Sequence, residues 1–372
     1  MESQTKRTPL FEGHRALGAK LVDFAGWDMP LQYSGVVDEY QTVRRAAGLF
    51  DVSHMGRIAV TGEGALAFLQ RMTTNDAAKL DVLGSQYSMV CNAQGGIKDD
   101  IFVSRLKPAV FLLCVNASNR EKILDWLLDH AKGEPSVTVQ DHSEQRAQLA
   151  LQGPAARGIL LDLGVAAIQS LKARQGLETS LLGTSAVITR TGYTGELGYE
   201  LYVPADQAMP VWQELLTRGK AAGLKPAGLG ARDLLRLEMA YLLYGNDISE
   251  ETTPLEAHAS WVVAFEKGDF IGREALHRQR TQGVRRQLVA LELVEKAVPR
   301  HGCRILETRQ GEKAIGVVTS GNLSPILQKG IGLGYVPPSK ATPGISLTVD
   351  IRGRRVPALV VKPPFYTKQA SG

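Results

Sequence analysis

The C-terminal part of the chain constrains the fold most strongly, because its pattern differs from everything before it. After Arg286 the sequence becomes a series of short segments rich in Val, Ile and Leu, separated by Gly, Pro and Asn. Such runs predict β-strands joined by tight turns. The segments are QLVALEL (287–293), AIGVVTSG (314–321), GIGLGYV (330–336) and SLTVDIRGRRVPALVV (346–361). We therefore predict a separate all-β domain over residues 285–372.

Helical and strand patterns alternate irregularly before this domain, which favours an α+β fold over a doubly wound parallel sheet. Residues 118–133 predict a helix with Ser118 and Glu121 as a capping box and Gly133 at its end. Residues 206–223 predict another helix, with Pro210 in its first turn. Since 372 residues are too many for one ordinary core, we expect two or three domains.

Composition argues against several classes of protein. The longest apolar run, Ala109–Val115, is too short to span a membrane, and the N-terminus has no apolar signal region, so we expect a cytoplasmic protein. The 3 cysteines are widely spaced and the 7 histidines lack metal-ligand spacing, which argues against a zinc cluster or metal enzyme. The basic segment 273–286 has no interleaved aromatics. It favours a solvated helix face over a nucleic-acid site, although a docking surface for an acidic protein stays open.

The stretch NAQGGIKDD (92–100) places two aspartates at the entrance of a predicted strand. If the strand begins near Ile97, alternation puts Asp99 on the apolar face and Asp100 on the polar face, beside Lys98. The two carboxyl groups would then point opposite ways, which argues against a shared-proton dyad. Gly95 and its neighbour allow a tight turn and close approach of a flat ligand. On this pattern alone, a polar turn that leads into a strand remains the simpler interpretation.

Two further segments carry residues that plain structure explains less well. In RTGYTGELGYELYV (190–203), Glu200 precedes an apolar run, and a carboxylate there suits a planar ligand with adjacent N–H donors, although a hairpin explains the glycines. In PAGLGARDLLRLE (226–238), Arg232 falls near a helix start, where the helix dipole disfavours a cation unless it pairs with an acid or an anion. Tyr87 could line a pocket with Asp100. His54 fits both a general base and a satisfied turn histidine.

Taken together, these stretches resemble the T-protein family of the glycine cleavage system, the tetrahydrofolate-dependent aminomethyltransferases. The resemblance runs from about residue 7 to residue 366 and rests on motifs that occur in order along the chain. They are DFAGWDMPLQY, GLFDVSHMG, YSMVCNAQGGIKDD, LALQGP, TRTGYTGELGYEL, PAGLGARDLLRLE, LYGNDI, DFIGREAL and TSGNLSP.

The resemblance implies a three-domain, cloverleaf-like α+β protein with a barrel-like or jelly-roll-like C-terminal domain and folate in a central channel. The domains would be residues 1–50 with 142–272 as the folate-binding core, 51–141 as a second α+β domain, and 285–372. The implied reaction moves the methylene carbon of an aminomethyl group from the dihydrolipoyl arm of H-protein to tetrahydrofolate, which gives 5,10-methylenetetrahydrofolate and ammonia. The chain alone would be a monomer.

The resemblance also assigns roles to residues. Asp100, the second aspartate of IKDD, would be the catalytic carboxylate, and Asp99 would serve structure. Glu200 would grip the pterin edge, and Arg232 matches the family's arginine at the folate site. Three tyrosines would line the folate pocket, and they are Tyr87, Tyr241 and Tyr366.

This chain departs from the family pattern at two places. Lys98 stands where relatives usually have an aliphatic residue, and aromatics are missing upstream of TRTGYTG. A folate-dependent S- or O-demethylase on the same scaffold therefore remains an alternative. A non-enzymatic folate-binding protein of iron–sulfur maintenance is a second alternative, but its KGC-x-TGQE-type motif is missing from the sequence.

Overall fold

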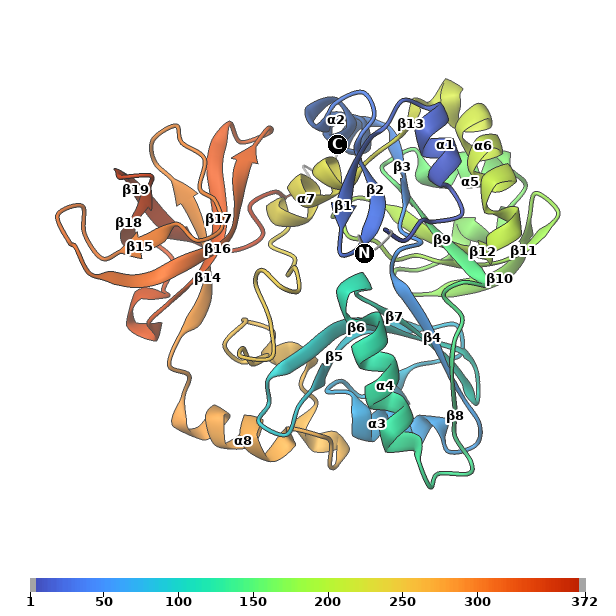
Figure 1. The fold of residues 1–372 in the computed structure, drawn as a ribbon, viewed down its shortest axis with the longest axis horizontal. Coiled ribbons are helices and arrows are strands. Elements are labelled where there is room, and N and C mark those ends of the chain that lie inside the picture. Colours follow the sequence, from blue (N-terminus) through green and yellow to red (C-terminus); the bar gives the residue numbers. More distant parts are fainter. Residues whose placement is uncertain (1–4, 368–372) are drawn as a thin grey trace. The chain divides into compact units, whose positions relative to one another are not determined.

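The computed structural model describes residues 5–367, and the chain forms two compact units (Figure 1). The first unit contains the residues up to Ser88 together with Asp99–Arg232, and the second contains Met89–Lys98 together with the residues from Asp233 onward. The predicted α+β fold class is confirmed, because the described residues form helices, β-sheets and a β-barrel.

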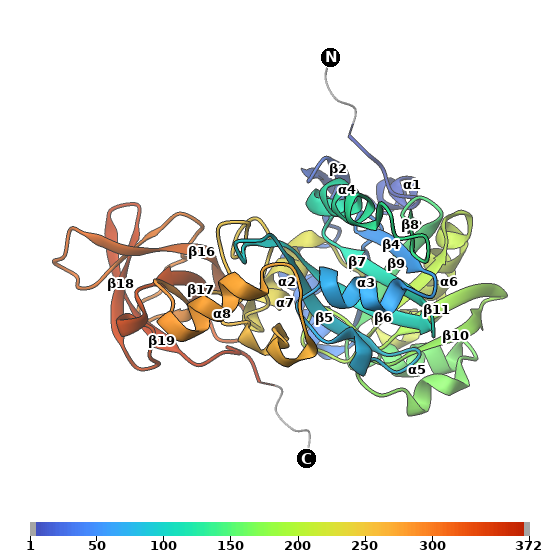
Figure 2. The ribbon, with the colours of Figure 1, turned by 90° about the horizontal axis from the view of Figure 1, so that it is seen from below.

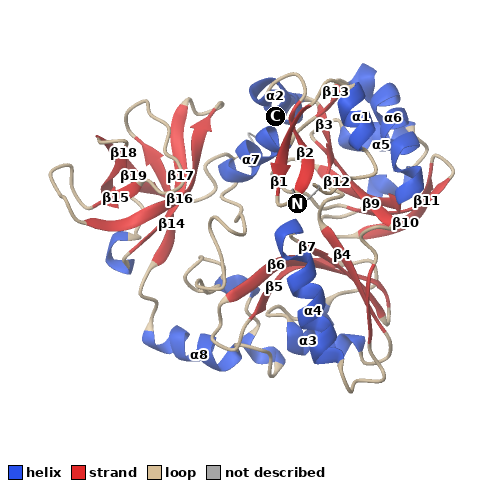
Figure 3. Ribbon diagram, viewed as in Figure 1, coloured by secondary structure: helices blue, strands red, loops and turns tan. Residues whose placement is uncertain are grey.

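The first unit is built around a six-stranded sheet, which is antiparallel except for the parallel pair β3 and β13. Its strands, in spatial order, are β10 (Gly176–Leu181), β11 (Thr184–Thr189), β12 (Gly198–Pro204), β9 (Arg146–Gln152), β3 (Ala47–Asp51) and β13 (Leu224–Pro226). Helix α5 (Ala156–Asp162) packs on β12 and α6 (Ala208–Gly219) packs on β13 (Figure 3). Buried Leu149, Leu201 and Trp212 contribute to the core of this sheet.

Shorter elements complete this part of the unit. They are α1 (Phe11–Ala16), the hairpin β1 (Lys20–Phe24) and β2 (Trp27–Gln32), and α2 (Val36–Arg45). Helix α6 confirms the predicted helix over 206–223, since Val211, Trp212 and Leu215 are buried on one face.

A five-stranded sheet carries the two aspartates. Its strands, in spatial order, are β5 (Ser85–Cys91), β6 (Ile97–Lys107), β7 (Val110–Val115), β4 (Gly56–Thr61) and β8 (Thr138–Asp141). Helices α3 (Ala65–Met72) and α4 (Arg120–Ala131) lie beside it in both views (Figures 1 and 2). The predicted capping box of α4 is wrong. The helix begins at Arg120 after a short 3₁₀ turn, Ala117–Asn119, and no side chain caps it.

Strand β6 begins at Ile97, and its burial alternates as the sequence predicts. Asp99 and Ile101 are buried, whereas Lys98, Asp100 and Phe102 are partly exposed. The turn before β6 requires glycine at residue 96, because a Cβ atom there would lie 1.9 Å from the carbonyl oxygen of Glu250.

The C-terminal part of the second unit is a closed six-stranded barrel, which confirms the predicted all-β segment. Its strands, in order round the barrel, are β14 (Gln287–Leu293), β17 (Lys329–Val336), β16 (Ala314–Ser324), β15 (Arg304–Leu306), β18 (Ser346–Ile351) and β19 (Arg354–Val361). Apolar side chains such as Leu291, Val318 and Val349 fill its interior. Helix α8 (Arg273–Gln282) precedes the barrel in the chain.

Candidate active site

Two neutral side chains hold the carboxyl group of Asp100. The Tyr87 hydroxyl, on β5, donates a hydrogen bond to Oδ2 at 2.8 Å, and the Asn116 amide donates one to Oδ1 at 2.8 Å. Burial, followed by the charge of Asp100, raises the pKa of Tyr87 well above its ordinary value. Tyr87 therefore remains a neutral donor, and each oxygen of Asp100 has a fixed orientation.

Asp99 lies on the opposite face of β6 and is fully buried. Its Oδ2 accepts a hydrogen bond from the Asn116 backbone N–H at 3.0 Å, and Oδ1 accepts from the side-chain amides of Asn116 at 2.8 Å and Asn119 at 2.5 Å. Burial, and then the charge of Asp100, raises the pKa of Asp99 to about 8. The opposite orientations are as predicted, but one amide contacts both carboxyl groups, so the two acids are linked.

Glu200 lies on β12, and its partners come from the neighbouring strand β9 and from the loop that follows β11. The Gln148 side chain of β9 donates to Oε1 at 3.0 Å, and the Thr191 hydroxyl donates to Oε2. Behind Gln148, the Cys114 thiol donates to Oε1 of the Gln148 amide at 3.5 Å. Burial, and then the charge of Glu200, raises the pKa of Cys114 to about 12. The carboxylate is thus held rigidly, and each oxygen keeps a lone pair that can accept a further hydrogen bond.

Arg232 lies near the start of α7 (Leu229–Glu238), within the first unit. Its guanidinium carbon lies 4.7 Å from the centre of the Tyr193 ring, which is a cation–π contact. Burial lowers the pKa of Arg232, and the neighbouring Tyr193 and Glu200 oppose that effect. In the described part of the chain, the guanidinium donates no hydrogen bond and forms no ion pair. The site therefore offers a cation to an anionic group.

Tyr193 joins these residues into one neighbourhood. It acts electrostatically on both Tyr87 and Arg232, and Arg232 in turn acts on Cys114 and His54. The structure thus brings four of the predicted residues into one unit, and they are Tyr87, Asp100, Glu200 and Arg232.

Tyr241 and Tyr366 belong to the second unit, and the backbone of each is hydrogen-bonded to the last residues of α7. The Tyr241 N–H donates to the carbonyl of Arg236 at 2.9 Å. The Tyr366 N–H donates to the carbonyl of Glu238 at 3.1 Å. The two tyrosines therefore lie near the same helix end, and their role stays a prediction.

His54 does not match the satisfied turn histidine that the sequence offered as one of its two roles. It is 2% exposed, packs edge-on against Phe24 with ring centres 5.6 Å apart, and its Nδ1 finds no hydrogen-bond partner among the described residues. Burial lowers its pKa to about 3, and Arg232 contributes, although Asp51 opposes the shift. His54 is consequently a neutral, buried imidazole at physiological pH.

This burial makes the fold sensitive to acid. Between pH 6.5 and 3 the unfolded chain binds a proton at His54 that the folded chain does not, so stability is lost as the pH falls through this window. At pH 5 the loss is about 2 kcal/mol. We expect His54→Gln to remove this part of the pH dependence, measured as the change in urea midpoint between pH 7 and 5. His277→Gln, at an exposed position of α8, is the control, and an equal loss in wild type and His54→Gln would contradict the prediction.

Three residues that contact the predicted site residues were not predicted from the sequence, namely Asn116, Gln148 and Tyr193. Gln148 could have been found from the sequence, because it is a polar residue within the apolar segment RAQLALQ. In the structure its side chain is fully buried. Asn116 follows the apolar run of β7 directly, but nothing local shows which strand it faces.

The structure gives each of the two departures from the family pattern an ordinary structural role. The Lys98 ammonium lies 3.3 Å from a carboxylate oxygen of Glu250, within the second unit. The segment that lacks aromatics contributes aliphatic residues to the first unit's core, including Ile168, Leu177 and Leu181.

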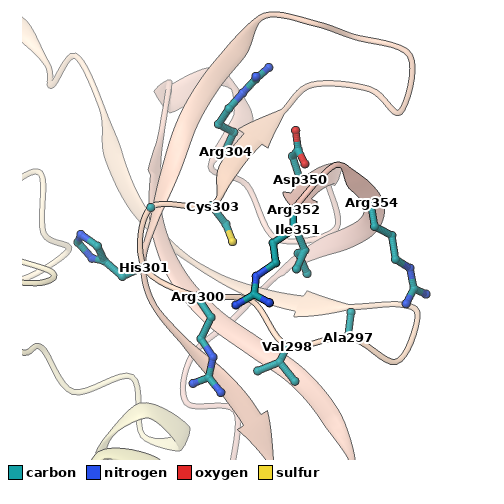
Figure 4. A pocket seen from close by; sticks show the side chains of 11 residues that line it. Ala297, Val298, Arg300, His301, Cys303, Arg304, Asp350, Ile351, Arg352 and Arg354 are labelled. Atoms are coloured by element: carbon teal, nitrogen blue, oxygen red, sulfur yellow. The ribbon is translucent and has the colours of Figure 1, made fainter.

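The barrel carries a hollow of about 810 Å³ on its surface (Figure 4). Exposed charged side chains such as Arg300 and Arg352 line it together with Cys303. None of the predicted site residues lines this hollow.

Residues 5–367 lack two other kinds of feature. No group of three or more His, Cys, Asp or Glu side chains in that range is arranged to hold a metal ion. No helix in that range has both the length and the apolar composition needed to cross a membrane.

Comparison with known proteins adds independent information. The family model described as "GCVT N-terminal domain" matches residues 10–267, and the "Glycine cleavage T-protein C-terminal barrel domain" matches residues 286–367. An aminomethyltransferase of Halothermothrix orenii is 49% identical over 97% of this chain and 99% of its own length. That of Bacillus subtilis is 43% identical over 98% and 99%. The crystal structure of glycine cleavage system aminomethyltransferase T from Bartonella henselae superposes with a TM-score of 0.90, at 37% identity, over 97% of this chain and 98% of that one.

Proposed function

Because the chain belongs to the T-protein family of the glycine cleavage system, we propose that the cluster around Asp100 is where it binds tetrahydrofolate and performs its reaction. The chain is an aminomethyltransferase, as its relatives over nearly full length are. Its co-substrate, its protein partner and the roles of individual residues are the proposal.

The proposed donor is the aminomethyl group on the dihydrolipoyl sulfur of H-protein. In the reaction the methylene carbon loses its bonds to nitrogen and sulfur and gains bonds to N5 and N10 of tetrahydrofolate. The two protons released from N5 and N10 balance the two needed to form ammonia and the lipoyl thiol. The products are 5,10-methylenetetrahydrofolate, ammonia and reduced lipoyl H-protein.

Asp100 is proposed to stabilise the cationic iminium character that develops as nitrogen leaves. The observation that carries this role is the pair of hydrogen bonds from Tyr87 and Asn116, which fix both oxygens of one partly exposed carboxylate. A fixed charge aimed at a developing charge costs no reorganisation during the reaction. Most of the remaining rate would come from alignment of lipoyl arm and folate.

Glu200 and Arg232 are proposed to bind opposite kinds of group on folate. The carboxylate of Glu200 suits the adjacent N–H donors of a pterin edge. The guanidinium of Arg232 suits a carboxylate of the glutamate tail, because it has no acidic partner among the described residues. We also propose Tyr241 and Tyr366 as folate contacts, because the family resemblance implies that role for them. We also retain the three predicted domains, 1–50 with 142–272, 51–141 and 285–372, as a proposal.

The test is a single coupled assay. Purified protein is mixed with tetrahydrofolate and aminomethyl-loaded H-protein, and ammonia and 5,10-methylenetetrahydrofolate are measured together. We expect the two products in a one-to-one ratio, since the reaction forms one of each.

Two controls separate the alternatives. Omission of tetrahydrofolate should abolish methylenetetrahydrofolate and slow the release of ammonia. Tight tetrahydrofolate binding with neither product from loaded H-protein would contradict the proposal. Sulfur- and oxygen-methylated donors would then test a demethylase on the same scaffold.

A further inference from the structure

Asp99 and Asp100 belong to one hydrogen-bonded network, although they are on opposite faces of β6. The Nδ2 atom of Asn116 lies 2.8 Å from Oδ1 of Asp99 and 2.8 Å from Oδ1 of Asp100. Asp99 also accepts the backbone N–H of Asn116. Asn116 is thus held at two points by Asp99 and presents its amide to Asp100.

Among the described residues, acids and amides surround Asp99 and no cation touches it. Asp100, the next residue on the same strand, acts electrostatically on Asp99, and Asp99 acts electrostatically on Tyr87 of β5. The turn that follows β7 contributes only the neutral amides of Asn116 and Asn119. Within residues 5–367, no lysine, arginine or histidine hydrogen-bonds to Asp99 or forms an ion pair with it. Two negative charges this close, one of them fully buried, strongly disfavour each other.

We propose that Asp99 is a positioning residue for the reaction: through Asn116 it fixes the carboxylate of Asp100, and the two acids share one negative charge at neutral pH. This inference rests on the proposed role of Asp100. Asp99 itself touches no substrate. It acts by keeping the Asn116 amide directed at Asp100.

The arrangement has a consequence at alkaline pH. When Asp99 ionises, its carboxylate attracts the Asn116 amide more strongly and competes with the two Asp100 oxygens that share the two hydrogens of this NH2 group. Asp100 then loses a donor that fixes its orientation, so kcat falls. Wild-type enzyme should therefore show a decrease in kcat with an apparent pKa near 8, the value to which burial and Asp100 raise Asp99.

The kinetic test uses Asp99→Asn, which removes the ionisable carboxyl group of residue 99. The new amide has an NH2 donor in place of one carboxyl oxygen, and this donor repels the N–H groups of Asn116. We expect kcat at pH 7 to fall about tenfold, because the alignment of Asp100 is disturbed, while the KM for tetrahydrofolate stays the same. The decrease near pH 8 should disappear. Asp141→Asn, on β8 of the same sheet, is the matched control and should retain the decrease. A decrease that persists in Asp99→Asn would overturn the proposal.

A second measurement does not depend on turnover. In protein labelled with ¹³C-carboxyl aspartate, one resonance that is absent from Asp99→Asn should titrate near pH 8. In Asp100→Asn the same resonance should titrate at lower pH, since one source of repulsion is gone. Titration of Asp99 in the ordinary carboxyl range in wild type would refute the shared charge. If instead the resonance behaves as expected but Asp100→Asn keeps full activity, the acid pair stands and the catalytic role of Asp100 fails.

Discussion

Replacement of Asp100 by Asn is expected to lower kcat by roughly 10²–10⁴-fold. The substitution keeps the size of the side chain and removes its charge, so the developing iminium cation loses its counter-charge. Tetrahydrofolate should still bind, because Glu200 and Arg232 are untouched. The measurement is kcat in the coupled assay, together with the tetrahydrofolate dissociation constant from fluorescence or calorimetry.

The interpretation of this result needs a folded variant. Asp125→Asn, at an exposed position of α4, serves as the control for the chemistry of the substitution and should behave as wild type. Circular dichroism and the thermal midpoint of Asp100→Asn should match those of this control. A variant that folds and turns over at the wild-type rate would remove Asp100 from the mechanism.

Replacement of Glu200 by Gln should weaken tetrahydrofolate binding about 10- to 100-fold, the range expected when a charged hydrogen bond is lost. Gln offers one acceptor where Glu offers two, and its amide would meet the Gln148 and Thr191 donors unfavourably. Since Glu200 is proposed to bind rather than to react, kcat at saturating folate should change much less than the dissociation constant.

Two companion variants sharpen this test. Glu178→Gln lies at an exposed position on β10 of the same sheet and should bind folate normally. Glu200→Asp keeps the negative charge but holds it farther from the ligand, because the side chain is one methylene shorter. This variant should bind tetrahydrofolate with intermediate affinity. A large fall in kcat with unchanged binding in Glu200→Gln would assign Glu200 to the chemistry instead.

Local pattern predicted much of the fold and part of the site. The alternation of β6 correctly separated Asp99 from Asp100, because one face of that strand is buried. The strands of the barrel were predictable because turn residues separate short apolar runs. The capping box of α4 was wrong because Ala117–Asn119 form a separate 3₁₀ turn before the helix starts.

The link between the two acids depends on strand register, which no local pattern fixes. Next to the turn that connects β6 and β7, Lys107 lies opposite Val110. A bulge then shifts the register by one residue, so that Arg105 lies opposite Phe111 and Phe102 opposite Cys114. Continuation of that register places Asn116 opposite Asp100. Without the bulge the register would slip by one residue, and Asn116 would fall on the other face. Tyr193 was missed for a similar reason, since its contact with Arg232 joins a loop to a helix distant in sequence.

Two of the three cysteines are poorly reactive at neutral pH, which makes the chain suitable for single-site labelling. Burial raises the pKa of Cys91 to about 12, and Cys114 reaches about 12 as well, so neither forms the thiolate that alkylating reagents need at neutral pH. Cys303, which is partly buried as Cys114 is, lines the barrel's surface hollow. A maleimide dye or spin label can therefore be attached to the barrel of the unaltered protein, and it would occupy a hollow that no proposed site residue lines.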